Sequence, residues 1–393
     1  MAGRRRWGYA ISVWLISASL LQSWNVQAAS EQAVTERVKE TSCSTSNSNT
    51  SNREIVTAIV SVKEPSLLEQ YPSEKNQSLS EYIAAETGQR EGVQRQIAQI
   101  KQKICALEDT VEFLDEYDVA FSGFSVKLPR DRVDELRGLD GVQEVAIQQT
   151  YTLPEQSEQE NDLSEEAATA LPVQTSANAT GKGTVIAVLD TGIFDAHEAF
   201  GETPAKGKYT YDKMQQMLDM AGERLVSVQS AQGALHTADD VFRNAKIPYA
   251  YDYANNKSEF DISNPHGTQI ADVAAGKNGV APDAQLFSMK IYDESNQTTD
   301  TAILAALQDA ITLGADVIDV NVGKSGAFSS EADAMMQEVY DAVRSAGISL
   351  EAPAGEGETY RAKAENPDCG SIHTPAANRA ALSVAAAHNG SQA

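Results

Sequence analysis

Two residues in this sequence stand where a carboxylate and an imidazole could work as a pair. The run 185–192 reads Val-Ile-Ala-Val-Leu-Asp-Thr-Gly, so Asp190 lies where an apolar strand ends in a turn. The run 266–271 reads His-Gly-Thr-Gln-Ile-Ala, which places His266 at the start of a predicted helix. A carboxylate bonded to one ring nitrogen fixes the histidine tautomer and stabilises the imidazolium, so the other nitrogen can take a proton from a serine hydroxyl. The pattern therefore predicts general-base chemistry at Asp190 and His266.

Other chemistries fit the same residues less well. An aspartic protease also has Asp-Thr-Gly after an apolar strand, but it needs two such carboxylates, and only one occurs here. A phosphate-binding loop follows a strand, whereas the glycines in 181–184 precede one. The ordinary alternative is a turn-forming Asp190 and a capping or solvent-exposed His266. That ordinary role is expected for the other histidines, which are His197, His236, His373 and His388.

The composition and the first residues bear on partners and location. The chain has 393 residues and a formal net charge of −25, which argues against a nucleic-acid partner because phosphates need clustered Lys and Arg. Arginines at 4–6 precede an apolar stretch over 7–24 and small residues around Ala28. This order predicts a secretory signal peptide over residues 1–28, cut after Ala28 or Ala29, and hence a secreted or cell-surface protein. An uncleaved membrane anchor is the alternative.

The three cysteines, Cys43, Cys105 and Cys369, are far apart and form no Cys-x-x-Cys pair. An odd and sparse set of this kind predicts neither a disulfide framework nor a metal site. We therefore expect all three to be structural or incidental, and we expect no cofactor.

The sequence before residue 181 divides into regions of different amino-acid composition. Residues 29–53 are rich in Ser, Thr, Asn and Glu and predict a flexible lead-in. Residues 54–150 predict a small α+β domain, and residues 151–180 predict a linker that is acidic between Pro154 and Pro172. Within the small domain, strands are expected at 55–62, 119–128 and 142–147, an amphipathic helix at 93–107 and a short helix at 133–139.

Residues 181–393 alternate between apolar runs and helical patterns. The expected strands are 184–189, 286–291, 317–322, 348–352 and 383–386, and the clearest expected helix is 301–313. Near-continuous apolar strands separated by helices indicate a parallel sheet that is covered on both faces. The sequence therefore predicts an α/β domain after the linker.

Further sequence blocks follow the segments that contain Asp190 and His266, and they match the same family of proteins. They are 246–253, 279–284, 307–310 followed by 313–318, and 366–370 with 374–376. Together with 188–192 and 266–268, in this order, they make the region from about 180 to 390 resemble a subtilisin-like serine protease domain. Within that family, the sequence blocks are most similar to those of the lactocepin-like cell-envelope proteinases. The stretch from 121–126 through 141–145 resembles the inhibitory propeptide of the same family.

This resemblance implies a fold, a reaction and partners. The implied fold is a subtilisin-like parallel sheet with helices on both faces, incomplete in this chain and preceded by an α+β propeptide domain. Asp190 would orient His266, and His266 would be the base for a serine in peptide-bond hydrolysis. The implied partners are a protein or peptide substrate, bound as an added extended strand, and the chain's own propeptide, bound to the peptidase domain until it is cut at the linker. Calcium is common in the family, but no ligand loop for it is readable here.

The sequence departs from the family pattern at several positions. Glu356 stands where the family has an asparagine that donates to the oxyanion, and an ionised glutamate would oppose the developing negative charge. Asp272 stands where a close-packed helix has glycine, and it adds bulk and a charge that needs a partner. The segment 321–323 reads Asn-Val-Gly in place of Ser-Leu-Gly, and no Gly-Thr-Ser-like nucleophile turn occurs. The sequence therefore predicts a fragment that lacks the serine.

Two functional hypotheses follow from these observations. The first is an exported serine endopeptidase whose serine lies outside these residues. The second is a catalytically inactive, truncated pseudoprotease, or a chain whose working part is a propeptide that inhibits or chaperones a relative in trans. A decaying fragment without a function is a third possibility.

Overall fold

The computed structural model describes residues 53–72, 78–153, 179–201, 204, 206–230, 236–323, 330–355 and 372–385. The predicted signal peptide, nearly all of the lead-in and most of the acidic linker lie outside these residues, as do Glu356 and His388. Within the described parts of the chain, none of the helices is both long enough and apolar enough to cross a membrane.

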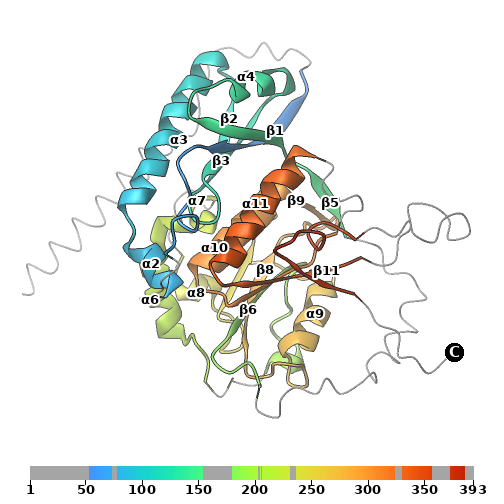
Figure 1. Cartoon of the computed structure of the whole chain (residues 1–393). Helices are drawn as coiled ribbons and strands as arrows, with labels where there is room; N and C mark the ends of the chain where they lie inside the picture. Colours follow the sequence, from blue (N-terminus) through green and yellow to red (C-terminus); the bar gives the residue numbers. More distant parts are fainter. Residues whose placement is uncertain are drawn as a thin grey trace, which may run out of the picture. The chain divides into compact units, whose positions relative to one another are not determined.

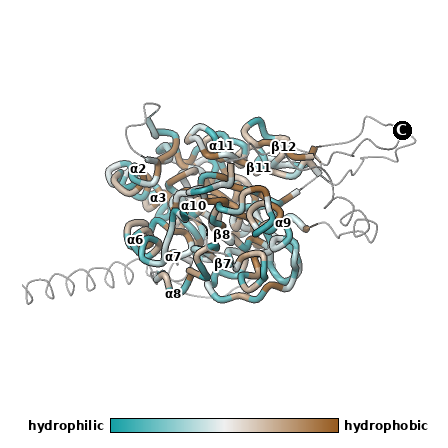
Figure 2. The backbone as a smooth tube through the Cα atoms, turned by 90° about the horizontal axis from the view of Figure 1, so that it is seen from below, coloured by the Kyte–Doolittle hydropathy of each residue, from teal (hydrophilic) through white to brown (hydrophobic). Residues whose placement is uncertain are grey.

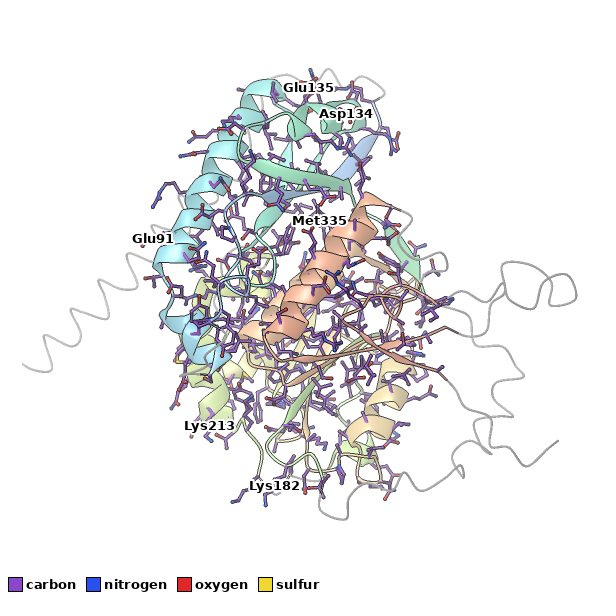
Figure 3. All side chains as sticks on the ribbon, viewed as in Figure 1. Glu91, Asp134, Glu135, Lys182, Lys213 and Met335 are labelled. Atoms are coloured by element: carbon purple, nitrogen blue, oxygen red, sulfur yellow. The ribbon has the colours of Figure 1, made fainter. Side chains whose placement is uncertain are left out.

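A small domain before residue 150 contains a four-stranded antiparallel sheet in the order β2-β3-β1-β4. Its strands are β1 Ile55–Val62, β2 Glu112–Tyr117, β3 Gly123–Pro129 and β4 Val142–Ile147, and its helices are α2 Leu79–Ala85, α3 Gly88–Leu107 and α4 Val133–Arg137. Helix α3 buries the apolar face of the helix predicted at 93–107, except for Leu107, which is 37% exposed. Exposed carboxylates such as Glu91 and Asp134 lie on the outside of this domain (Figure 3). The α+β prediction is confirmed.

The larger domain is built on a six-stranded parallel sheet in the order β12-β11-β10-β6-β8-β7. Its strands are β6 Val185–Asp190, β7 Tyr249–Asp252, β8 Gln285–Lys290, β10 Val317–Val320, β11 Ser349–Pro353 and β12 Leu382–Val384. Its helices are α6 Tyr211–Ala221, α7 Val226–Ser230, α8 Ala238–Val241, α9 His266–Ala275, α10 Asp300–Thr312 and α11 Glu331–Ser345. The sequence prediction omits β7, whose four residues are too few to show a clear pattern.

Different helices cover the two faces of this sheet (Figure 1). Successive residues of β6 point to opposite faces. Ala187 and Leu189 belong to the large core that contains α10 and α11 residues. Val188 packs in a second core with Ala271 of α9. The prediction of a parallel α/β sheet with helices on both faces is confirmed.

Helix α11 has the pattern of a helix with one buried face. Ser330 caps its first turn with a capping box, and the buried side chains include Met336 and Val339, whereas Glu338 is exposed. Met335 is also buried, with 1% of its surface exposed. The alternation of hydrophobic and hydrophilic stretches along this helix can be followed in Figure 2.

A short strand extends the small domain onto the larger one. Strand β5, Thr150–Thr152, pairs antiparallel with β9, Gln297–Thr299, and the N–H of Leu153 continues the ladder to the carbonyl of Asn296 at 2.9 Å. The first residues of the region that the sequence assigns to a linker are therefore an ordered strand. An isolated three-residue strand has no local signal, because only its partner β9 satisfies its backbone groups.

Buried polar side chains of α10 hold the small domain in register. The Oε1 atom of Gln308, which is 2% exposed, accepts hydrogen bonds from the backbone N–H groups of Asp118 and Val119, each at 3.1 Å. The carboxylate of Asp300 accepts bonds from the Gln149 N–H and the Tyr151 hydroxyl, each at 2.6 Å. The predicted strand at 119–128 consequently begins only at Gly123, because residues 118–119 form the turn that contacts α10.

We expect Gln308→Ala to weaken this contact. The substitution leaves the N–H groups of Asp118 and Val119 buried without an acceptor, and each such loss costs about 1–3 kcal/mol. Urea unfolding of the full chain should show a free energy of unfolding lower by about 2–4 kcal/mol. Gln216→Ala on the exposed face of α6 is the matched control and should change it by less than about 0.5 kcal/mol. An equal effect of both substitutions would contradict the role given to Gln308.

Glu108 provides a pH-dependent prediction. Its side chain is 8% exposed, and hydrogen bonds from Thr110, Arg53 and Arg132 hold the pKa of its carboxyl at about 2, below the ordinary 4.5. A lowered folded-state pKa stabilises the fold fully above about pH 4.5, and this stabilisation is lost as the pH falls towards 2.

Glu108→Gln should therefore lower the free energy of unfolding by about 2 kcal/mol at pH 7. The difference from the unaltered chain should shrink steadily in urea titrations at pH 5, 4 and 3. Glu112→Gln, which removes the exposed ion pair with Lys127, is the control and should have little effect at any pH. A deficit that stays constant down to pH 3 would rule out this linkage.

Candidate active site

The structure brings Asp190 and His266 together. Asp190 is the last residue of β6 and has no exposed side-chain surface, and His266 is the first residue of α9 with 25% of its side chain exposed. The Nδ1 atom of His266 lies 2.9 Å from both carboxylate oxygens of Asp190. The N–H of Thr191 donates to the Oδ1 of the same carboxylate at 2.6 Å.

This contact determines which ring nitrogen carries the proton. A carboxylate can only accept, so Nδ1 carries the proton that is donated to Asp190, and Nε2 of the neutral ring keeps its lone pair. The part of the ring that remains exposed can reach a reacting group. The arrangement can thus hold a general base whose charged form is stabilised by a buried carboxylate.

Two glycines allow α9 to approach the end of β6. A Cβ atom at Gly267 would lie 2.6 Å from the carbonyl oxygen of Gly192 and 3.0 Å from Cβ of Asp190. Gly192 has a φ of +94°, and a Cβ there would lie 2.6 Å from Cδ1 of Ile262. A larger residue at Gly267 would push the helix from the strand, and one at Gly192 would displace Ile262 and strain the positive φ.

Thr191 ties together the two segments that carry the pair. Its hydroxyl donates to the carbonyl oxygen of Asn264 at 3.0 Å and accepts from the N–H of Gly267 at 2.9 Å. The side chain of Asn264 in turn accepts from the N–H of His266 at 3.0 Å. The sequence analysis gives no role to Thr191 or Asn264, although both stand beside residues that it selects.

A buried ion pair lies on the strand next to Asp190. Lys290 of β8 is the register partner of Asp190, and its Nζ atom lies 2.8 Å from Oδ2 of Asp252. The two side chains are 3% and 0% exposed. Each charge needs the other because an unpaired charge at this depth would be strongly destabilising. No local pattern identifies this pair, since its members are far apart in the sequence.

A side-chain hydrogen bond links the residue before β9 to the segment that carries His266. The Nδ2 atom of Asn264 donates to Oδ1 of Asn296 at 2.9 Å, which joins the segment before His266 to the residue before β9. Strand β5 runs along β9 in the direction of Asn296, where Leu153 makes the last backbone bond. An extended chain on β9 therefore passes towards Asn264 and the segment that carries His266.

The residues that differ from the family pattern have different surroundings in the structure. Asp272 is half-buried, not fully buried, and its carboxylate occupies the space where a Cβ at Gly276 would lie, at 1.9 Å. The glycine at 276 thus makes room for Asp272, and the expected need for a charged partner does not arise at this degree of exposure. The side chain of Asn321 donates to Oδ2 of Asp319 at 3.0 Å. Glu356 lies outside the described residues.

The expectation that the other histidines cap helices or face solvent is wrong for two of them. His197 does cap a short helix, through Nδ1 and the N–H of Ala199. His236 is 9% exposed, its ring lies 5.1 Å from that of Tyr251, and burial lowers its pKa. His373 is 5% exposed and fills the space between Gly323 and Gly355, where added Cβ atoms would lie 2.7 and 2.8 Å from its ring.

Cys105 is disulfide-bonded, which gives this one cysteine a structural role. In the segments that the structure covers, no group of three or more His, Cys, Asp or Glu side chains is arranged to hold a metal ion.

Comparisons with known families cover most of the chain. The model described as "Subtilase family" matches residues 181–393, and the model described as "Peptidase inhibitor I9" matches residues 27–154. The second match includes β5.

Individual relatives are similar over part of their length. The PI-type proteinase of Lactococcus lactis subsp. cremoris is 26% identical over 302 residues, which cover 70% of this chain and 15% of that protein. The C5a peptidase of Streptococcus pyogenes serotype M3 is 28% identical over 223 residues, covering 52% of this chain and 18% of that protein. The chain thus spans less than a fifth of the length of these relatives.

Among solved structures, fervidolysin from Fervidobacterium pennivorans, described as a keratinolytic enzyme related to subtilisin, aligns with a TM-score of 0.46 and 15% identity. The alignment covers 86% of this chain and 44% of that one.

Gly267→Ala tests the close approach of α9 and β6. The added methyl group would meet the backbone oxygen of Gly192 at 2.6 Å, so the helix must shift and strain the Asp190–His266 contact. We expect the free energy of unfolding to fall by about 1–3 kcal/mol in urea titrations. Gly201→Ala is the control, because its added Cβ would lie 3.8 Å from the nearest atom at an ordinary φ of −74°. If both variants were equally stable, the steric argument would be wrong.

Proposed function

This chain belongs to the Subtilase family, and from that premise we propose that it carries the aspartate and histidine of a serine endopeptidase. Asp190 holds the ring of His266, and His266 takes the proton of a serine hydroxyl as that oxygen attacks a peptide carbonyl. His266 then donates the proton to the leaving amine as the peptide bond breaks. The proposal concerns the whole protein, because no nucleophile turn of the family's kind occurs in these 393 residues.

The contact between His266 and Asp190 carries the proposal. A carboxylate without any exposed surface receives the Nδ1 proton at 2.9 Å, while the ring stays one-quarter exposed. A histidine that merely filled a core would be buried on both sides, and a surface histidine would not need a buried carboxylate. The combination favours a base whose Nδ1 is oriented by the buried carboxylate and whose exposed side can react.

The substrate in this proposal is a protein or peptide that binds as an added strand. Strand β9 is paired with β5 through backbone hydrogen bonds, and this mode of binding needs no particular side chains. Hydrogen bonds lead from Asn296 through Asn264 to His266, so a peptide on β9 would extend towards the base. Strand β5 thus stands in the place proposed for a substrate.

The domain division and the location belong to the same proposal. Residues 1–28 would be the signal peptide that exports the chain, 29–53 a lead-in, 54–150 the inhibitory propeptide, 151–180 the linker that is cut and 181–393 the peptidase portion. The structure supports one change, because the strand at 150–152 pairs with β9 and belongs with the propeptide. Glu356 would lower activity relative to the family residue at this position.

A second function is favoured by the contacts of the small domain. Gln308 and Asp300 each accept two hydrogen bonds from it, and Gln229 exchanges bonds with the backbone of Glu116 at 3.0 and 3.2 Å. So specific a contact suits an inhibitor or folding chaperone that acts on an intact relative. In that case, the chain itself would be an inactive pseudoprotease.

The endopeptidase proposal is tested on the full product of the gene, assayed with quenched fluorescent peptides. Asp190→Asn should lower kcat/KM by roughly 10⁴-fold and His266→Ala by roughly 10⁶-fold, because the base and its orienting group act together. Asp212→Asn on the exposed first turn of α6 is the control and should leave kcat/KM unchanged.

Undiminished hydrolysis by the Asp190 and His266 variants would refute the roles given to these residues. If the unaltered product cleaves nothing, the endopeptidase proposal fails and the inhibitor remains. Purified residues 54–153 should then inhibit a related active subtilase at micromolar concentration, and the absence of inhibition would eliminate that second function.

A further inference from the structure

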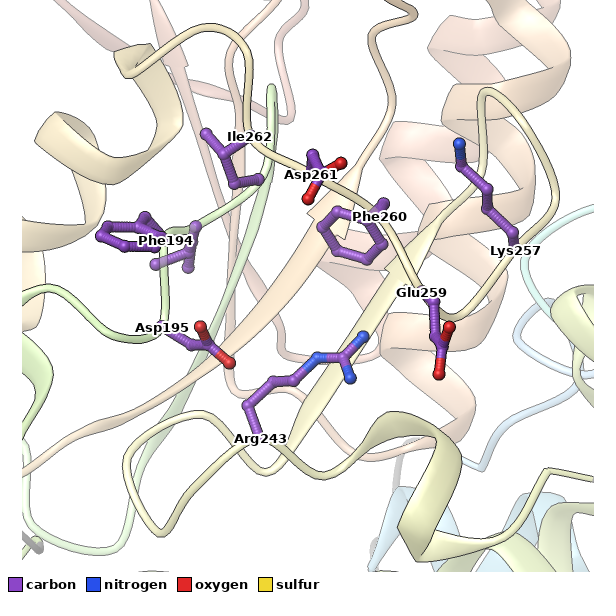
Figure 4. Close-up of a pocket in the computed structure, with 9 residues that line it drawn as sticks. Phe194, Asp195, Arg243, Lys257, Glu259, Phe260, Asp261 and Ile262 are labelled. Carbon is purple, nitrogen blue, oxygen red and sulfur yellow. The ribbon is translucent and has the colours of Figure 1, made fainter.

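A cavity of about 710 Å³ lies beside the Asp190–His266 pair, and the proposed reaction gives it no role. Its walls come from the segment that follows β6, the segment that leads into α9 and the residues before β7 (Figure 4). The N–H of Phe194 donates to the hydroxyl of Thr268 in α9 at 3.0 Å. The walls are therefore attached to the same two elements that hold the pair.

Among the lining residues, Phe194, Asp195, Asp261 and Ile262 combine carboxylates with apolar surface. Phe194 is 50% exposed, which is unusual for a large apolar side chain. Across the described residues, the carboxylates of Asp195 and Asp261 have neither a hydrogen bond nor an ion pair. An aromatic face flanked by unpaired carboxylates is suited to a cation with an apolar stem.

Both cations of the cavity have partners of their own. Arg243 donates to the backbone oxygen of Ser258 and lies 5.6 Å from the centre of the Phe260 ring. Lys257 lies on the side away from Phe194 in Figure 4, with its Nζ atom 3.8 Å from a carboxylate oxygen of Glu294. The lining as a whole has three carboxylates and two cations, so it keeps a net negative charge.

We propose that this cavity is a subsite for a basic side chain, lysine or arginine, of a peptide substrate. The aliphatic stem would pack on Phe194 and Ile262, and the charged head would lie between the carboxylates of Asp195 and Asp261. Such a head makes charge-assisted hydrogen bonds, which are stronger than neutral ones. The inference rests on the proposed function, because a substrate chain near His266 would deliver the side chain.

An acidic ligand that binds Arg243 is the competing possibility. It is less favourable because the guanidinium already has the Ser258 carbonyl and the Phe260 ring as partners. It would also bring a negative charge close to three carboxylates, none of which has a hydrogen bond or an ion pair among the described residues. Like charges at this spacing repel, so the test includes an acidic probe.

The binding test uses the full chain with 13C-labelled isoleucine methyl groups. Ile193 and Ile262 line the cavity and report on it, whereas Ile83 of α2 is an internal reference. The probes are the Nα-acetyl methylamides of arginine, norleucine and glutamate. We expect the arginine probe to shift the Ile262 methyl saturably and to bind at least about tenfold more tightly than the norleucine probe, with weaker binding at higher salt.

The double variant Asp195→Asn/Asp261→Asn keeps the shape of the site and removes both charges. It should lose at least about tenfold in affinity for the arginine probe, while its Ile83 methyl signal stays in place and shows an intact fold. Asp212→Asn removes an exposed carboxylate of α6 and should bind like the unaltered chain.

Equal binding of arginine and norleucine, stronger binding of glutamate, or full arginine affinity in the double variant would each overturn the inference. The readout is binding, so it is independent of hydrolysis. A chain that binds the arginine probe but whose full product fails the peptidase assay would contradict the proposed function alone.

Discussion

The hydrogen bond between Asp190 and His266 depends on how closely α9 approaches the carboxyl end of β6. Gly192 and Gly267 permit the approach, since a Cβ on either would collide with an atom of the facing segment. The hydroxyl of Thr191 then bridges to Asn264 and Gly267 and holds the two segments at this spacing. Asp190 is fully buried, so its carboxylate must be paired, and the imidazole satisfies it. The distance between the backbones of α9 and β6 therefore determines where the imidazole of His266 lies.

The register in which the small domain packs on the larger one is determined by buried polar groups. Along α10, Asp300 and Gln308 accept from the small domain, and the adjacent Asp309 accepts from the N–H groups of Val226 and Ser227. Burial raises the pKa of Asp309 to about 6, so the folded chain must satisfy that carboxyl internally. A buried polar group that lacks its partner is costly, and this makes such contacts specific for one register.

Carboxylates also gather around the candidate site. Asp319 of β10 lies near the pair, where burial raises its pKa to about 6 and Asn321 donates to it. Asp195 and Asp261 lie in the cavity on the segments that flank Asp190 and His266. The chain as a whole has a net charge of −25. A surface of one sign attracts oppositely charged ligands, so the charge around the site and the chemistry inferred for its cavity agree.

The sequence by itself determined the layers of the fold and the two residues of the pair. Apolar runs and helical periodicity arise from residues close together in the chain, so β6, β8, β10 and α10 could be predicted within a few residues. Asp190 and His266 could be selected because each follows or begins such an element. Only the tertiary structure decided the pairing of β5 with β9, the support from Thr191 and Asn264, the burial of His373 between two glycines and the cavity beside the pair. These features depend on contacts between distant segments, which leave no local pattern.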